Sequence, residues 1–195
     1  ITEPLKKLRD LGYVRREIPY GENEKNSKKG LYFITDPLLR FHFRFVSPYA
    51  SLLEVGAEDA VLSMIKKQFS SFTSEYWELM CRKYVSGRDI DGVIYNKASR
   101  WWGKIFTGND NTGRMVELDV VAESLDRKHI LVGECKWTGT EDAAALTSRL
   151  QAIIPHLPFV KKAQAVHVVL FTKVPPKNAD AASVFLPEDV LKFSV

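Results

Sequence analysis

The sequence predicts a mixed α/β (α+β) fold whose main domain runs in the order helix, three strands, helix, strand. Three observations predict it. Apolar residues recur at helical spacing over residues 57–85. Three short runs of strand-like composition, separated by polar turns, follow between residues 98 and 137. An amphipathic helical pattern at 141–154 then precedes a strongly apolar strand at 165–172.

Length and composition fit one substantial domain with a smaller appendage. The chain has 195 residues, 45% hydrophobic and 27% charged, and contains neither a membrane-spanning run nor a signal peptide. Its two cysteines, Cys81 and Cys135, form no metal-binding or disulfide pattern, so we expect a reducing, cytoplasmic location. The chain opens without Met and in mid-fold, so we expect a fragment of a longer protein. Homo-oligomerisation stays open.

The first element is expected to be a short helix over residues 2–11. Thr2 would cap it, and Gly12 follows where a left-handed C-terminal cap is expected. Two strands, at 13–20 and 31–35, then flank a long polar turn. A helix followed by a long-tipped β-hairpin resembles the second half of a winged helix, whose first two helices would precede residue 1.

The N-terminal quarter is basic, which favours a polyanion partner. Residues 1–50 hold ten Lys/Arg against six Asp/Glu, a surplus that accounts for the whole net charge of +4. A winged helix binds DNA with a helix in the major groove and contacts backbone phosphate with its hairpin. The predicted DNA contacts are therefore Lys6, Lys7, Arg9, Lys25, Lys28 and Lys29. An equally weighted alternative is that this segment packs on a neighbouring domain and binds no DNA.

A helical segment follows the hairpin. Asp36 and Pro37 start a helix as cap and first residue, and Leu38, Phe41 and Phe45 share a face that we expect in the core. The next helical pattern is expected to break near its paired serines, at positions 70 and 71, into two helices. The predicted organisation is thus a partial winged helix (1–36), a helical linker (37–72) and a C-terminal domain (73–195).

In the C-terminal domain, strands are predicted at 98–106, 115–123 and 129–137. The segments NDNTG (109–113) and 124–128 supply the turns. The third strand ends in Gly-Glu-Cys-Lys-Trp, which places two charged residues at the end of an apolar run. Burying either charge alone is expensive, so a specific partner is expected.

The charged residues of this strand end predict a metal site. Glu134 and Lys136 alternate with apolar neighbours and therefore share one face. A hairpin turn centred near residue 126 puts Asp119 roughly opposite residues 132–134, close to Glu134. Converging carboxylates repel each other unless a cation lies between them, and hard oxygen ligands favour Mg²⁺ or Mn²⁺.

The chemistry that such a site supports is metal-dependent phosphodiester hydrolysis. The cation would polarise a phosphoryl oxygen and lower the pKa of its bound water. Lys136 would orient the attacking water or stabilise charge on the phosphate, and the carbonyl oxygen of Cys135 would add a ligand.

The spacing of Asp119, fourteen residues, and Glu134-Cys135-Lys136 resembles the D…ExK signature of the PD-(D/E)XK nuclease superfamily. The element order resembles that superfamily's restriction-endonuclease-like core. The resemblance implies that Asp119 and Glu134 bind the metal and that Lys136 assists the nucleophile. A glutamate of the first core helix often joins them, matched best by Glu78 and next by Glu75. Leu118 stands where the superfamily's name has Pro.

A wider resemblance covers nearly the whole chain. It is carried by LGYVRREIPYGE (11–22), LYFITDPLLRFHFRFV (31–46), RWWGK (100–104), ELDVVA (117–122) and ILVGECKW (130–137). These stretches resemble the C-terminal region of a family of archaeal and bacterial P-loop ATPases with an AAA-like module, a winged helix and a nuclease-like domain. The resemblance implies an ATPase module N-terminal to this chain as partner. No P-loop motif occurs here, so no nucleotide site is expected in this chain.

Two functions stay open, because a fold does not imply an activity. The first is a DNA-associated ATPase module that acts as a Mg²⁺- or Mn²⁺-dependent endonuclease. The second is an inactive nuclease-fold module for DNA or protein binding and for regulation of the ATPase. Under the second, Glu134 and Lys136 are a salt-bridged pair at a strand end, and Asp119 pairs with an arginine such as Arg114. Glu78 then forms an i, i+4 pair with Arg82.

Overall fold

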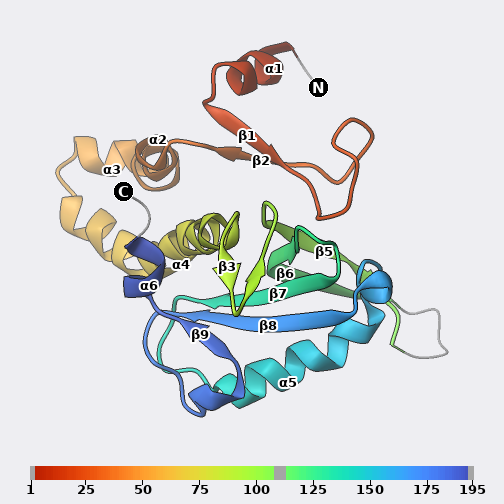
Figure 1. Cartoon of the computed structure of the whole chain (residues 1–195). Helices are drawn as coiled ribbons and strands as arrows, with labels where there is room; N and C mark the ends of the chain where they lie inside the picture. The colour runs from red at the N-terminus through yellow and green to blue at the C-terminus, as the bar shows by residue number, and fades with distance from the viewer. Residues whose placement is uncertain (1–2, 108–112, 193–195) are drawn as a thin grey trace. The chain divides into compact units, whose positions relative to one another are not determined.

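Two units make up the chain in the computed structural model, which describes residues 3–107 and 113–192 (Figure 1). The N-terminal unit comprises residues 1–18 and 22–70, and the C-terminal unit comprises residues 19–21 and 71–195. The finer division at residues 36 and 72 stays a prediction. None of the helices described is long and apolar enough to span a bilayer.

The N-terminal unit begins with the expected helix and hairpin. Helix α1 (Glu3–Asp10) is followed by Gly12, whose φ of 81° is the expected left-handed conformation. The expected N-terminal cap, Thr2, lies outside the described residues. Strands β1 (Val14–Glu17) and β2 (Leu31–Ile34) pair antiparallel and are shorter than predicted. The ladder is therefore four residue pairs long, and a long loop joins its strands.

Arg16 on β1 holds the hairpin loop from inside. Its guanidinium donates to the carbonyl oxygens of Glu24, at 2.5 Å, and Ser27, at 2.6 Å. At the edge of the same loop, Lys29 pairs with Glu22 at 2.6 Å. Side-chain donors thus satisfy carbonyls that no strand partner reaches.

The helical segment starts as expected but then changes its winding. Asp36 caps helix α2 (Pro37–Phe41) by accepting from the backbone N–H of Leu39 at 2.9 Å. A π-helical turn (His42–Val46), a 3₁₀ turn (Ser47–Tyr49) and helix α3 (Ala50–Glu54) follow. Phe45 is fully buried, but Leu38 is 75% exposed, so its assignment to the core was wrong. The wider π-helical turn places Phe45 off the face that regular helical spacing assigns to Leu38.

Helix α4 (Glu58–Val85) is one continuous helix, so the break expected near residues 70 and 71 was wrong. The segment contains neither Gly nor Pro, and serines alone do not interrupt a helix. The hydroxyl of Ser74 bonds back to the carbonyl of Ser71 at 2.8 Å, which satisfies it within the helix.

A five-stranded mixed sheet forms the centre of the C-terminal unit. Its strands, in spatial order, are β5 (Ser99–Ile105), β6 (Arg114–Glu123), β7 (His129–Lys136), β8 (Ala165–Thr172) and β9 (Ser183–Phe185). Strand β6 is antiparallel to both of its neighbours, β5 and β7, whereas β7, β8 and β9 run parallel to one another. Helix α5 (Ala143–Ile153) connects β7 to β8 and covers one face, while the second half of α4 covers the other (Figure 1).

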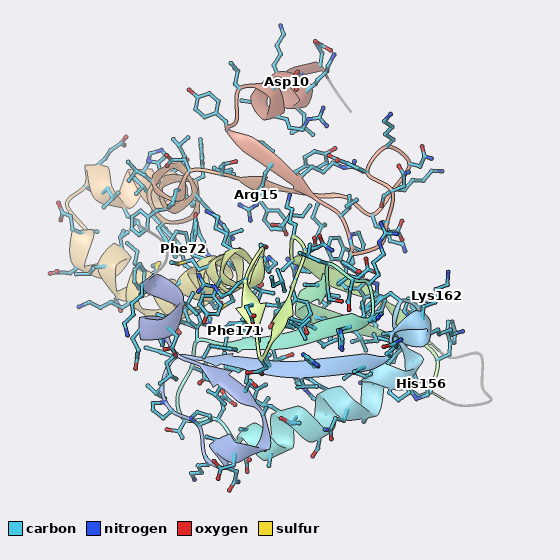
Figure 2. All side chains as sticks on the ribbon, viewed as in Figure 1. Asp10, Arg15, Phe72, His156, Lys162 and Phe171 are labelled. Atoms are coloured by element: carbon cyan, nitrogen blue, oxygen red, sulfur yellow. The ribbon has the colours of Figure 1, made fainter. Side chains whose placement is uncertain are left out.

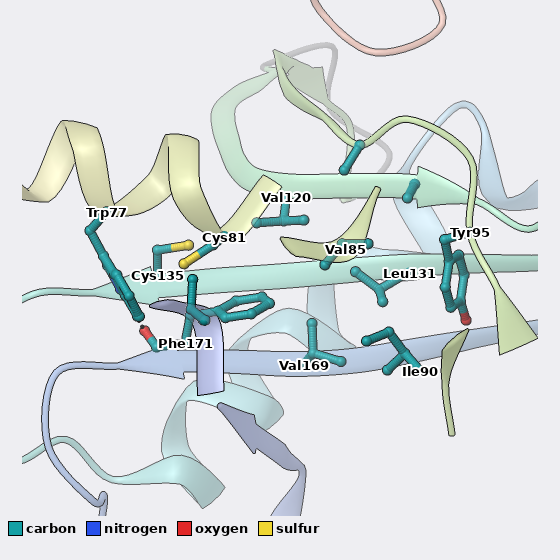
Figure 3. Close-up of a cluster of buried hydrophobic side chains, with 13 residues drawn as sticks. Trp77, Cys81, Val85, Ile90, Tyr95, Val120, Leu131, Cys135, Val169 and Phe171 are labelled. Carbon is teal, nitrogen blue, oxygen red and sulfur yellow. Dashed lines mark hydrogen bonds between the residues drawn. The ribbon is translucent and has the colours of Figure 1, made fainter. Parts of the chain in front are cut away.

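Each face of the sheet has its own apolar layer. On the α4 side, Trp77, Cys81 and Val85 pack on Leu131 and Phe171 (Figure 3). On the α5 side, a second cluster joins the buried face of that helix to the sheet. Figure 2 draws the side chains on both faces of the sheet. A strand covered on both faces reads as a continuous apolar run, which is why β8 was predicted to the residue.

Several short elements escaped prediction. They are the hairpin β3 (Asp89–Ile90) and β4 (Val93–Ile94), strand β9, and helix α6 (Pro187–Leu191). Of the predicted turn at 109–113, residues 109–112 lie outside the described part of the chain.

Candidate functional site

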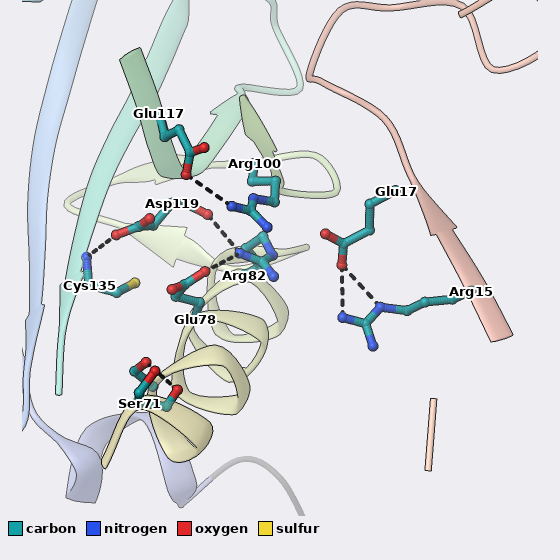
Figure 4. Close-up of polar contacts among 10 residues, drawn as sticks. Arg15, Glu17, Ser71, Glu78, Arg82, Arg100, Glu117, Asp119 and Cys135 are labelled. Atoms are coloured by element: carbon teal, nitrogen blue, oxygen red, sulfur yellow. Dashed lines mark hydrogen bonds and ion pairs between the residues drawn. The ribbon is translucent and has the colours of Figure 1, made fainter. Parts of the chain in front are cut away.

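Strands β6 and β7 separate at Asp119. Their ladder ends with Val120 opposite Gly133, so Asp119 stands opposite Glu134 in register, in agreement with the expected pairing. At that point the backbone N–H of Cys135 donates to Asp119 Oδ2 at 2.8 Å (Figure 4). The Asp119 side chain thus takes the place of a backbone acceptor on β6 at this point. Its carboxylate is fixed by β7, the strand that carries Glu134.

Glu134 and Lys136 lie on the same face of β7, as their alternation predicts. Lys136 Nζ is 2.8 Å from Glu134 Oε1. Cys135 faces the opposite way, into the apolar layer beside Trp77 and Cys81, and burial raises the pKa of its thiol. The strand end therefore has one apolar face that anchors it and one charged face.

Arg149 is the residue that sequence reasoning missed. It projects from α5, and its Nη2 donates to Glu134 Oε1, the same oxygen that Lys136 contacts. The Glu134 side chain is 9% exposed and that of Arg149 is 53% exposed. A signal was present, because Arg149 is the one charged residue between Ala143 and Ile153.

These side chains line a cleft of about 600 Å³ in the C-terminal unit. Every candidate catalytic and metal-binding residue lines it, together with two further basic side chains. The acidic and backbone candidates are Glu78, Asp119, Glu134 and Cys135, and the basic residues are Arg114, Lys136 and Arg149. The second-choice Glu75 is not among its lining residues.

Glu78 combines the two roles weighed for it. It forms the i, i+4 ion pair with Arg82, at 3.6 Å, and it also lines the cleft. Arg82 is buried and its Nη1 donates to the backbone carbonyl of Asp119 at 2.9 Å (Figure 4). Arg82 therefore ties helix α4 to β6 behind the carboxylates, through the backbone of Asp119.

Burial and neighbouring carboxylates both disfavour the charged form of Asp119 in the cleft. The pKa of Asp119 is raised from 3.8 to about 7, first by burial and then by the negative charges of Glu134 and Glu78. The Cys135 N–H and the charge of Lys136 oppose this rise. Negative charge at Asp119 is thus only partly compensated by the protein.

The free oxygens of this cluster suit a hard cation. Asp119 Oδ2 accepts from Cys135 and Glu134 Oε1 accepts both basic side chains, so Asp119 Oδ1 and Glu134 Oε2 have no protein donor within residues 3–107 and 113–192. Over the same ranges, no three His, Cys, Asp or Glu side chains gather closely enough to hold a metal. Two carboxylates with a backbone oxygen and water fit Mg²⁺ or Mn²⁺, which keep several waters.

The candidate DNA-binding residues belong to the N-terminal unit. Lys6 and Lys7 on α1 are exposed, as are the three lysines of the hairpin loop, Lys25, Lys28 and Lys29. Arg9 forms an ion pair with Asp10, with 3.8 Å between Nη2 and Oδ1. Their role in DNA binding stays a prediction.

The chain is similar to proteins of unknown function. A family model, DUF234, described as archaeal and bacterial proteins of unknown function, matches residues 42–147. An uncharacterised protein of Methanocaldococcus jannaschii, MJECL04, is 28% identical over 145 residues, which are 73% of this chain and 30% of that protein. The chain thus spans less than a third of the length of this relative.

The solved structure found in the comparison is protein VC1899 from Vibrio cholerae. The match covers 96% of this chain and 46% of that one, with 14% sequence identity and a TM-score of 0.36. A similarity this low carries no structural argument.

Proposed function

This chain belongs to DUF234, the family of archaeal and bacterial proteins of unknown function, and we propose that its C-terminal unit is a cation-dependent phosphodiesterase acting on DNA. One observation carries the proposal: Asp119, Glu134 and Lys136 converge on one cleft where two strands separate. The topology of the sheet, antiparallel and then parallel, supports a restriction-endonuclease-like core.

Asp119 and Glu134 would hold the cation through the carboxylate oxygens that accept no hydrogen bond from the described residues. The carbonyl oxygen of Cys135 would be the third metal ligand. The raised pKa of Asp119 supports this assignment, because a bound cation would offset the burial and the carboxylate repulsion that raise it. Glu78 is close enough to act electrostatically on Asp119 and would hold a water of the ion.

The cation, when bound, supplies Lewis-acid polarisation of a phosphoryl oxygen and a bound water of lowered pKa. With Glu134 bound to the cation, the Nζ of Lys136 would leave that carboxylate. It would then orient the attacking water or neutralise charge on the phosphate. The buried face of β7, with Cys135 against Trp77, fixes the strand so that Lys136 and Glu134 keep their positions.

The surroundings of this site complete the proposal. The exposed lysines of α1 and the hairpin loop would contact backbone phosphate, as the partial winged helix implies. We also propose that the whole protein carries an ATPase module N-terminal to this chain, with DNA as the shared ligand.

Hydrolysis of DNA by the purified chain tests the proposal. With Mn²⁺ present, the wild type is expected to cleave single-stranded, duplex or branched DNA, and both Asp119→Ala and Lys136→Ala are expected to lose the activity. Lys161→Ala removes an exposed lysine outside the cleft lining and serves as the matched control. Absence of cleavage for all three DNA forms, with Mg²⁺ and with Mn²⁺, would sink the enzymatic claim.

The alternative is an inactive module, and one observation favours it. Glu134 is neutralised by two basic side chains, Lys136 and Arg149, in the arrangement of a structural ion-pair cluster. This alternative predicts DNA or protein binding that survives Glu134→Gln, with no hydrolysis in the wild type.

A further inference from the structure

We propose that Arg149 is a substrate-positioning residue with two partners: it neutralises Glu134 while the cleft is empty, and it binds a DNA phosphate once a cation occupies Glu134. The inference rests on the proposed function of the cleft. It assigns to α5 a role that the strand residues alone do not supply.

The contacts of Glu134 leave room for this exchange. Arg149 and Lys136 both contact Oε1, which leaves Oε2 without a protein donor in the described part of the chain. A cation that binds at Oε2 reduces the attraction of the Glu134 carboxylate for both basic side chains. The ion pair with Arg149 then weakens, because the same carboxylate charge is shared with a divalent ion.

Arg149 is better suited than Lys136 to change partner. Its side chain is 53% exposed, compared with 29% for Lys136, and only its Nη2 is bonded to protein. The remaining guanidinium N–H groups point to no protein acceptor among the described residues. A planar guanidinium matches two phosphate oxygens at once, whereas a lysine offers a single point charge.

The position of Arg149 also fits a phosphate next to the reacting one. Arg149 reaches Glu134 from helix α5, whereas Lys136 reaches it from the same strand, β7. The two basic side chains therefore come from different elements. Lys136 would act on the nucleophile, and Arg149 would bind a phosphate of the DNA backbone. Arg114 lines the same cleft and extends its basic lining along β6.

Two measurements that need no cleavage test the proposal on the whole chain. The first is Mn²⁺ affinity without DNA, by titration calorimetry or electron paramagnetic resonance. Arg149→Gln is expected to bind Mn²⁺ about five- to tenfold more tightly, because a partly exposed competing charge is removed. Lys161→Gln loses the same charge at an exposed position outside the cleft lining and is expected to match the wild type.

The second measurement is the salt dependence of duplex DNA binding with Mn²⁺ present, on catalytically blocked Lys136→Ala chains. Adding Arg149→Gln is expected to weaken binding and to lower the slope of log K against log salt by about 0.9, the value for one phosphate contact. Arg149→Lys keeps the charge and is expected to keep the slope while losing affinity. Circular dichroism checks that each variant is folded.

The inference is overturned if Arg149→Gln leaves Mn²⁺ affinity unchanged or weakens it, or if its salt slope equals that of Lys161→Gln. Tighter Mn²⁺ binding and a lower slope without any DNA cleavage would support the role of Arg149 and contradict the enzymatic proposal. Cleavage that requires Asp119, with Arg149→Gln behaving like the control, would support the enzyme and contradict this inference.

Discussion

At the residue scale, the two carboxylate oxygens of Asp119 have different surroundings. Oδ2 accepts the backbone N–H of Cys135, which fixes the carboxylate, and Oδ1 has no donor within residues 3–107 and 113–192. The proposed cation would bind at this second oxygen. Glu134 is similar, because basic side chains contact its Oε1 and no donor to its Oε2 lies in the same ranges.

Asp119 makes the stability of the chain depend on pH in a predictable direction. Its pKa is about 7 in the folded chain and 3.8 ordinarily, so between these values the folded state binds a proton that the unfolded state has lost. Stability contributed by this residue therefore falls as pH rises through that window. Asp119→Asn keeps the acceptor for Cys135 and removes the buried charge.

We therefore expect Asp119→Asn to match the wild type near pH 3 and to exceed its stability above about pH 7, by roughly 1–4 kcal/mol. Urea unfolding at several pH values, with divalent cations chelated, measures the difference. A difference that is constant with pH would contradict the raised pKa. Added Mn²⁺ is expected to stabilise the wild type more than the variant.

At the scale of elements, the separation of β6 and β7 follows directly after Gly133. This residue is the last of β7 to pair with β6, opposite Val120, and it also pairs with Val169 on β8. A Cβ at this position would lie 2.9 Å from Val120 Cβ and 3.0 Å from Val169 Cγ2. A side chain at residue 133 would therefore force these neighbouring side chains to move.

Gly133→Ala is expected to destabilise the chain by about 1–3 kcal/mol, the cost of an extra methyl group in a packed core. It is also expected to weaken Mn²⁺ binding, since Glu134 is the next residue. Thermal unfolding and calorimetry measure the two effects. Gly139→Ala is the matched control, because nothing lies within 4 Å of its added Cβ. Equal stability of the two variants would show that the strands can move apart without cost.

At the scale of the whole molecule, charge and chemistry are separated along the chain. The surplus of Lys/Arg lies within residues 1–50, whereas the carboxylate cleft belongs to the C-terminal unit. Under the proposed function, the N-terminal unit would therefore add phosphate contacts of its own to the contact proposed for Arg149 in the cleft. Replacing basic residues of the N-terminal unit should weaken DNA binding and leave the cleft unchanged.

Lys25→Gln with Lys28→Gln removes two exposed charges from the hairpin loop. We expect weaker duplex binding and a salt slope lower by about 2, since each phosphate contact contributes about 0.9. Mn²⁺ affinity is expected to stay unchanged. Filter binding over a range of salt concentrations measures the slope, and Lys161→Gln with Lys162→Gln is the control pair. A slope equal to that of the control pair would favour the alternative in which the hairpin contacts protein.

The sequence by itself determined the main elements of the C-terminal unit and the face on which its charges lie. Strand β8 was predicted to the residue, and α5 and the other long strands within two residues, because burial on one or both faces imposes a regular spacing of apolar side chains. The same alternation along β7 put Glu134 and Lys136 on one face. Local sequence is therefore sufficient to predict an element when its buried side chains recur with one regular spacing.

Tertiary structure alone decided the rest. No local pattern predicts that Arg149, fifteen residues from Glu134, reaches its carboxylate, because that contact depends on how α5 packs on the sheet. The short strand β9 is stabilised by its partner β8 rather than by its own three residues. The raised pKa of Asp119 also comes from burial and from charges on other elements, and so only the folded chain turns GECKW into one wall of a cleft.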